Sequence, residues 1–87
     1  MKFELIDDSI LYVSEVTIQE TQWFEYGYQW TSADNELIIR WDNSPHHNHI
    51  ETYPFHQHIG SSDNIYSSEP MTLHEVFRQI ETKISVP

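Results

Sequence analysis

The chain has 87 residues, of which 38% are hydrophobic and 14% are aromatic. This composition can build one modest core and argues against disorder, so we expect a single domain over residues 1–87. Fourteen acidic residues against four basic ones give a formal net charge of −10. That charge disfavours tight, independent binding to naked nucleic acid. It suits a basic protein or ribosomal surface, and it is equally consistent with solubility alone.

The absence of cysteine excludes a disulfide framework, a thiolate nucleophile and a cysteine-based zinc finger. Any metal site must therefore use His, Asp or Glu. Residues 1–13 contain acidic side chains where a signal peptide needs a continuous apolar run, and no segment reaches membrane-spanning length. We expect a soluble, cytoplasmic protein that makes no membrane contact.

Three strands are predicted in the first half of the chain. Residues 9–18 and 24–30 alternate between apolar and polar side chains, which is typical of half-buried strands. Residues 31–36 (TSADNE) supply turn chemistry through Asp and Asn, and residues 37–42 (LIIRWD) continue as the next strand. The last two strands should form a hairpin.

The second half begins with a loop, because Pro45 cannot donate a sheet hydrogen bond. Residues 49–59 look extended again, with Pro54 confining them to a sheet edge or to irregular pairing. Residues 61–68 read as a turn followed by a short last strand. No repeat, low-complexity tract or linker marks a second domain.

The end of the chain changes to helical periodicity. Thr72 is a suitable N-cap with Glu75 as its capping-box partner, and Met71 and Val76 could form a hydrophobic staple. The apolar residues at helical spacing are Leu73, Val76, Phe77, Ile80 and Ile84. The sequence thus predicts an α+β fold, an antiparallel sheet of about five strands with a C-terminal amphipathic α-helix packed on one face.

Five of the six histidines fall within residues 40–58, together with one of the two arginines. The period of a strand places Arg40 and Asp42 on one face, and it does the same for His56 and His58. The loop between these strands can bring His47 to the same site. One interpretation is zinc bound by His56 and His58 with Asp42 as an oxygen ligand, although His-x-His often occurs by chance.

A second interpretation is acid–base chemistry without a metal. Two histidines can divide the roles of general base and general acid, and an arginine can stabilise charge in the transition state. Arg40, His47, His56 and His58 could cleave RNA in this way. A third interpretation is structural: Arg40 pairs with a nearby carboxylate such as Asp42, while loop residues such as Asn43 and His46 satisfy backbone groups. The pattern alone leaves all three open.

At these residues the sequence resembles the TumE-type toxins of toxin–antitoxin systems, a family also described as a domain of unknown function. The family's hallmark is Arg-Tyr-Asp-Asn-Ala-Pro-His-His, followed after a spacer by Pro-His-His-Lys-His. Here these motifs read RWDNSPHH (residues 40–47) and PFHQH (residues 54–58), and the match extends from about Tyr26 to Ile80. Phe55 replaces the first histidine of the second motif and Gln57 replaces its lysine, so one candidate catalytic or phosphate-binding group and one positive charge are missing.

The resemblance implies the toxin of a type II toxin–antitoxin system, acting on RNA or translation. It implies a cognate antitoxin as partner, RNA or a ribosome as target and no cofactor, with a homodimer left open. The missing lysine, together with the net charge of −10, favours a toxin over an active nuclease unless a partner supplies positive charge. The alternative is a non-catalytic interaction or metal-binding module. The candidate catalytic residues are Arg40, His47, His56 and His58, and the residues expected to bind or shape the site are Asp42, Asn43 and His46.

Overall fold

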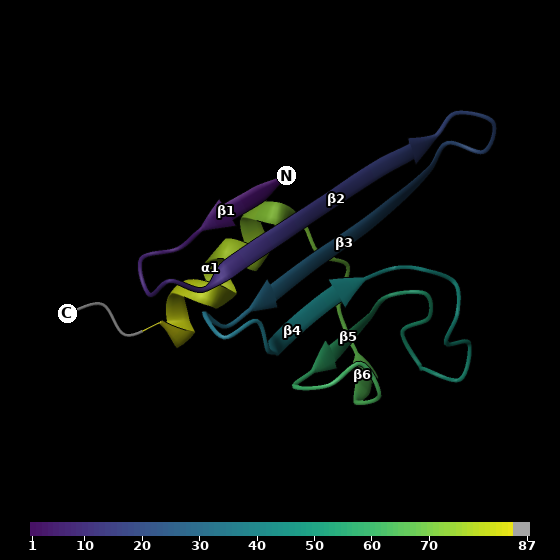
Figure 1. Ribbon diagram of the computed structural model, residues 1–87. Helices are drawn as coiled ribbons and strands as arrows, with labels where there is room; N and C mark the ends of the chain where they lie inside the picture. The colour runs from purple at the N-terminus through teal and green to yellow at the C-terminus, as the bar shows by residue number, and fades with distance from the viewer. Residues whose placement is uncertain (85–87) are drawn as a thin grey trace.

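A computed structural model describes residues 1–84. Its six strands form one antiparallel sheet in which each strand pairs with the next along the chain, and one helix follows them (Figure 1). The predicted α+β architecture is confirmed. The elements are β1 (Lys2–Glu4), β2 (Ile10–Ile18), β3 (Trp23–Thr31), β4 (Leu37–Asp42), β5 (His56–Ile59), β6 (Ile65–Ser67) and α1 (Leu73–Lys83).

The helix α1 begins where its sequence predicts, and it ends at Lys83 with Ile84 as the C-cap. Thr72 is the N-cap, and its hydroxyl accepts a hydrogen bond from the backbone N–H of Glu75 at 3.2 Å. Lys83 lies in the last turn, where its charge complements the helix dipole. Val76 and Ile80 are the buried residues of the helix. Within residues 1–84, no helix has the length and apolar composition that crossing a bilayer requires.

The hydrophobic core lies between α1 and one face of the sheet. Strand residues two apart share a face, and the alternation in β2, β3 and β4 sends one set of large apolar side chains toward the helix. The buried hydrophobic residues are Leu11, Val13, Tyr26, Tyr28, Trp30, Ile39, Trp41, Met71, Val76 and Ile80. The other set of strand residues therefore faces away from α1.

Strand register brings the polar residues of that second face together. In the β4–β5 pair, Arg40 lies opposite His58 and Asp42 lies opposite His56. In the β3–β4 pair, Gln29 lies opposite Arg40. Side chains directly opposite each other on antiparallel strands are close neighbours. A polar cluster thus forms across three strands, on the side of the sheet that α1 does not cover.

The predicted extended segment over residues 49–59 is wrong for residues 49–55, and only β5 is a strand there. The segment folds into successive turns, closed by hydrogen bonds from Ile50 N to His47 O, Tyr53 N to Ile50 O and Phe55 N to Thr52 O. Local hydrogen bonds therefore replace pairing with a neighbouring strand. We call residues 43–55 the connecting loop; it runs out beyond the end of β4 and returns to β5 (Figure 1).

Candidate active site

Asp42 is the centre of the polar cluster. Its Oδ1 lies 2.8 Å from Nε2 of His56, and its Oδ2 lies 3.0 Å from Nε of Arg40 and 3.4 Å from Nε2 of His58. The side chain of Asp42 is only 5% exposed, so water cannot satisfy its oxygens. One buried carboxylate thus holds an arginine and two histidines.

Backbone carbonyls fix the orientation of both histidine rings. Nδ1 of His56 lies 2.8 Å from the carbonyl oxygen of Pro54, and Nδ1 of His58 lies 2.9 Å from that of Ser62. A carbonyl oxygen can only accept, so each Nδ1 donates and must carry a proton. The opposite nitrogen of each ring, Nε2, faces the Asp42 carboxylate. Each ring is thus held between a backbone carbonyl and an oxygen of one carboxylate.

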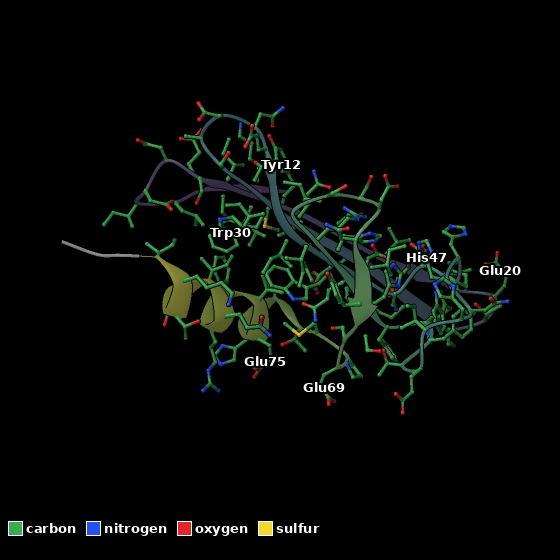
Figure 2. The ribbon with its side chains drawn as sticks, turned by 90° about the horizontal axis from the view of Figure 1, so that it is seen from below. Tyr12, Glu20, Trp30, His47, Glu69 and Glu75 are labelled. Carbon is green, nitrogen blue, oxygen red and sulfur yellow. The ribbon has the colours of Figure 1, made fainter. Side chains whose placement is uncertain are left out.

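His47 completes the cluster from the connecting loop. Its ring centroid lies 4.9 Å from that of His56 and 5.7 Å from that of His58, with the rings nearly edge to face. Desolvation lowers the pKa of His47 below its ordinary value of 6.5, and the charges of His56 and His58 lower it further. His47 is therefore the ring most disposed to be neutral and to accept a proton. It lies at the end of the molecule away from α1, on the side of Glu20 (Figure 2).

Arg40 presents the cluster's permanent positive charge. Its side chain is 36% exposed, and its Nη1 donates to Oε1 of Gln29 at 3.3 Å. The guanidinium lies over Gly27: a Cβ placed on that glycine would approach Arg40 Nη2 to 2.5 Å. Glycine is thus required for the guanidinium to lie this close to the backbone of β3. The exposed part of the guanidinium is free to meet an anion.

Two residues predicted to shape the site have different roles. Asn43 is buried and connects the loop to β3, since its Oδ1 accepts from Tyr26 N at 2.9 Å and its Nδ2 donates to Phe24 O at 2.8 Å. His46 is exposed, and its backbone N–H donates to the carbonyl of Ser44. Asn43 therefore positions the start of the connecting loop, whereas the His46 side chain lies at the surface.

The cluster also has the donor atoms of a metal site. One ring nitrogen from each of His47, His56 and His58 lies within 4.8 Å of the others. Imidazoles whose Nδ1–H groups bond to backbone carbonyls present Nε2 to a metal in many proteins. A transition-metal ion such as zinc would use these three nitrogens; the expected oxygen ligand Asp42 is not within this group of donors, and its carboxylate instead contacts His56 and His58.

Sequence comparison now identifies the family. A family model described as "Toxin TumE" matches residues 1–84 of the chain. The chain belongs to the TumE toxin family. The resemblance carried by residues 40–58 is thereby confirmed, and membership indicates a toxin. Searches of curated proteins and of solved structures gave no match.

The two departures from the TumE motif, Phe55 and Gln57, both lie away from the polar cluster. Gln57 alternates with His56 and His58 along β5, so it lies on the other face of the sheet, where its Nε2 donates to Ser67 O at 2.9 Å. Phe55 is partly buried against the hydrophobic core. The inference that these departures remove groups from the site is wrong, because neither position faces the cluster.

Four contributors to the cluster were not predicted from the sequence. Gln29 and Gly27 contact Arg40 from β3, and the carbonyls of Pro54 and Ser62 hold His56 and His58. The first two would follow from the register of the predicted hairpin, which pairs Gln29 with Arg40. The role of Ser62 has no signal in the sequence, because it depends on a backbone atom in a turn.

Proposed function

We propose that this TumE protein is the toxin of a type II toxin–antitoxin system and that it cleaves RNA without a metal. One observation carries the proposal: Arg40, His56 and His58 contact a single buried carboxylate, Asp42, on the face of the sheet that α1 does not cover, and the ring of His47 lies against both histidine rings. Arg40 brings a permanent positive charge to this site, and its side chain is 36% exposed. In a protein of net charge −10, an exposed guanidinium beside imidazole N–H groups suits a phosphate.

The proposed reaction is a transesterification within the RNA chain, in which the phosphorus exchanges its bond to the 5′-oxygen for a bond to the neighbouring 2′-oxygen. His47 takes the proton of a ribose 2′-hydroxyl, and the 2′-oxygen attacks the adjacent phosphorus. Arg40 stabilises the negative charge of the pentavalent transition state, with the ring of His56 as a further hydrogen-bond donor. The bond to the 5′-oxygen breaks, and His58 gives that oxygen its proton. The products are a 2′,3′-cyclic phosphate and a free 5′-hydroxyl, so no external reactant is required.

The roles of His56 and His58 follow from how tightly each is held. His56 is 2% exposed and its Nε2 lies 2.8 Å from Asp42, whereas His58 is 10% exposed and lies 3.4 Å away. The looser and more accessible ring can reach a leaving oxygen with less disruption. We therefore assign proton donation to His58, and to His56 the role of a fixed hydrogen-bond donor.

The partners of this reaction follow from the family and from the charge. A toxin of this type is expressed with a cognate antitoxin, which we expect to cover the cationic site until the toxin is released. With a net charge of −10, the protein is expected to bind free RNA weakly and to act best where a ribosome supplies positive charge. The target places its action in the cytoplasm.

Expression in a bacterial host without the antitoxin tests the proposal. We expect growth arrest with the wild type and relief with Arg40→Ala or His58→Ala, because each removes a group that acts in the transition state. Purified variants should cleave a quenched fluorescent RNA on the order of a hundredfold more slowly. Circular dichroism would establish that each variant folds.

His46→Ala is the matched control, since this exposed histidine is a neighbour of His47 in the same motif. It should remain toxic and cleave at the wild-type rate. Harmless wild-type expression, or folded alanine variants as toxic as the wild type, would contradict the catalytic proposal. A non-catalytic interaction or metal-binding module would then be favoured by the clustered ring nitrogens of His47, His56 and His58.

A further inference from the structure

An apolar pocket adjoins the polar cluster. Its volume is about 480 Å³, enough for a planar ring system, and its walls are Thr21, Trp23, Pro45, Tyr53 and Pro54. Trp23 is half-buried, and Tyr53 is 44% exposed. Exposed aromatic and proline rings around a hollow are unfavourable in water unless something covers them. A contiguous apolar hollow of this kind marks a site for ligand binding.

The position of the pocket indicates which occupant fits. Trp23 shares its strand face with Gly27 and Gln29, the β3 residues that contact Arg40. Pro54 is a wall of the pocket, and its carbonyl oxygen also holds Nδ1 of His56 at 2.8 Å. The pocket and the cluster thus share a residue and a face of the sheet. A ligand bound to the cluster extends naturally into the pocket.

The chemistry of the two neighbouring sites matches a nucleotide. The cluster offers the exposed guanidinium of Arg40 to an anion, while the pocket offers Trp23 and Tyr53 to a flat, weakly polar ring. Bases of single-stranded nucleic acid stack on such side chains in a way that tolerates any sequence. A base within a duplex is already stacked and cannot enter. A phosphate with an adjacent unstacked base satisfies both sites at once.

We propose that the Trp23–Tyr53 pocket holds a nucleobase next to the phosphate at the cluster, so that the substrate is single-stranded RNA. This inference rests on the proposed function, since it takes the cluster to bind an RNA phosphate. Stacking supplies affinity that the acidic protein surface does not. Specificity for unpaired RNA then comes from the pocket, whereas the cleavage chemistry comes from the cluster.

Binding of a non-cleavable ligand tests the pocket separately from catalysis. The probe is a fluorescent, single-stranded 2′-O-methyl hexanucleotide at low salt, followed by anisotropy; it lacks the 2′-hydroxyl that the proposed reaction needs. Tyr53→Ala should raise the Kd about tenfold through loss of one stacked base. Tyr53→Phe, which keeps the ring, should restore the affinity. Tyr66→Ala is the matched control, because Tyr66 is a tyrosine on β6 that is 51% exposed, compared with 44% for Tyr53, and it does not line the pocket.

The outcomes separate this inference from the proposed function. Equal affinities of wild type and Tyr53→Ala, or no binding by the wild type, would overturn the pocket assignment even if the protein cleaves RNA. So would a Tyr53→Ala variant that loses affinity for the antitoxin but not for the oligonucleotide. Conversely, ring-dependent binding in a protein that fails to cleave RNA containing 2′-hydroxyls would support the pocket and overturn the catalytic proposal.

Discussion

Protonation of a single ring, His47, should set the acidic side of the pH–rate profile. Desolvation and the neighbouring His56, His58 and His49 lower its pKa, while Asp42 opposes them. A general base must be neutral, so activity should rise with pH through the pKa of His47, with a midpoint below 6.5. RNA cleavage by the purified protein, measured as kcat/KM against pH, gives this midpoint.

The control for that profile is His49→Ala. Its ring centroid lies 6.1 Å from that of His47, and its charge is one of the causes of the lowered pKa. Removing it should move the midpoint upward toward 6.5 without abolishing cleavage. A midpoint at or above 6.5 in the wild type, or an acidic limb that persists in His47→Ala, would exclude His47 as the base.

Gly27 illustrates how one residue without a side chain can control activity. A Cβ at this position would lie 2.5 Å from Arg40 Nη2 and 3.2 Å from its Cζ, so Gly27→Ala must push the guanidinium off β3. We expect RNA cleavage to slow about tenfold or more, as for loss of part of an electrostatic contact. Stability should fall little, because the flexible end of Arg40 can move and alanine suits a strand better than glycine.

Gly60 differs from Gly27 because its backbone conformation, and not a close contact, requires glycine. A Cβ at this position would meet nothing within 4 Å, but Gly60 has a φ of +74°, which an alanine adopts at a cost of about 1–2 kcal/mol. The variant Gly60→Ala should therefore have a lower Tm and a normal cleavage rate. If Gly27→Ala also lost stability and kept its rate, Gly27 would be a structural glycine and not one that positions Arg40.

At the scale of elements, local patterns predicted most of the fold. The alternation of apolar and polar residues predicted β2 and β3, and the turn residues TSADNE predicted the hairpin between β3 and β4. The N-cap Thr72 predicted the start of α1. Each of these signals acts between residues close in the sequence, which is why it can be read there. β1 was missed because its three residues pair with only the first part of β2 and carry too short a pattern.

The conformation of the connecting loop could not be predicted from local sequence patterns. Strand periodicity predicts that Arg40 and Asp42 share one face of β4 and that His56 and His58 share one face of β5. The approach of His47 to these rings depends instead on turns within residues 43–55 and on the two hydrogen bonds by which Asn43 attaches the loop to β3. Such long-range contacts have no local periodicity. The composition of the site could be predicted from the sequence, but its depth of burial and its hydrogen bonds could not.

At the scale of the whole molecule, charge is distributed unevenly. The four basic residues are Lys2, Arg40, Arg78 and Lys83. Arg78 lies on α1, 3.9 Å from Glu75, and Lys83 follows in the last turn of the same helix. Arg40 alone of these lies on β4, beside the imidazoles of His56 and His58. In the proposed function Arg40 attracts an RNA phosphate to this one place on an acidic surface, and salt should weaken that attraction strongly.

Whether the fold depends on a metal is also a property of the whole molecule, because a structural ion contributes its binding free energy to folding. The proposed reaction uses no ion, because the ring nitrogens of His56 and His58 already lie 2.8–3.4 Å from the Asp42 carboxylate and from the carbonyls of Pro54 and Ser62. Protein dialysed against a chelator should therefore keep its Tm and its cleavage rate. Differential scanning calorimetry with elemental analysis checks this. Three results together would show instead that the three imidazoles form a metal site. The protein would contain stoichiometric zinc, and its Tm would fall by several degrees in chelator and recover with zinc. The variant His56→Ala would lose that response.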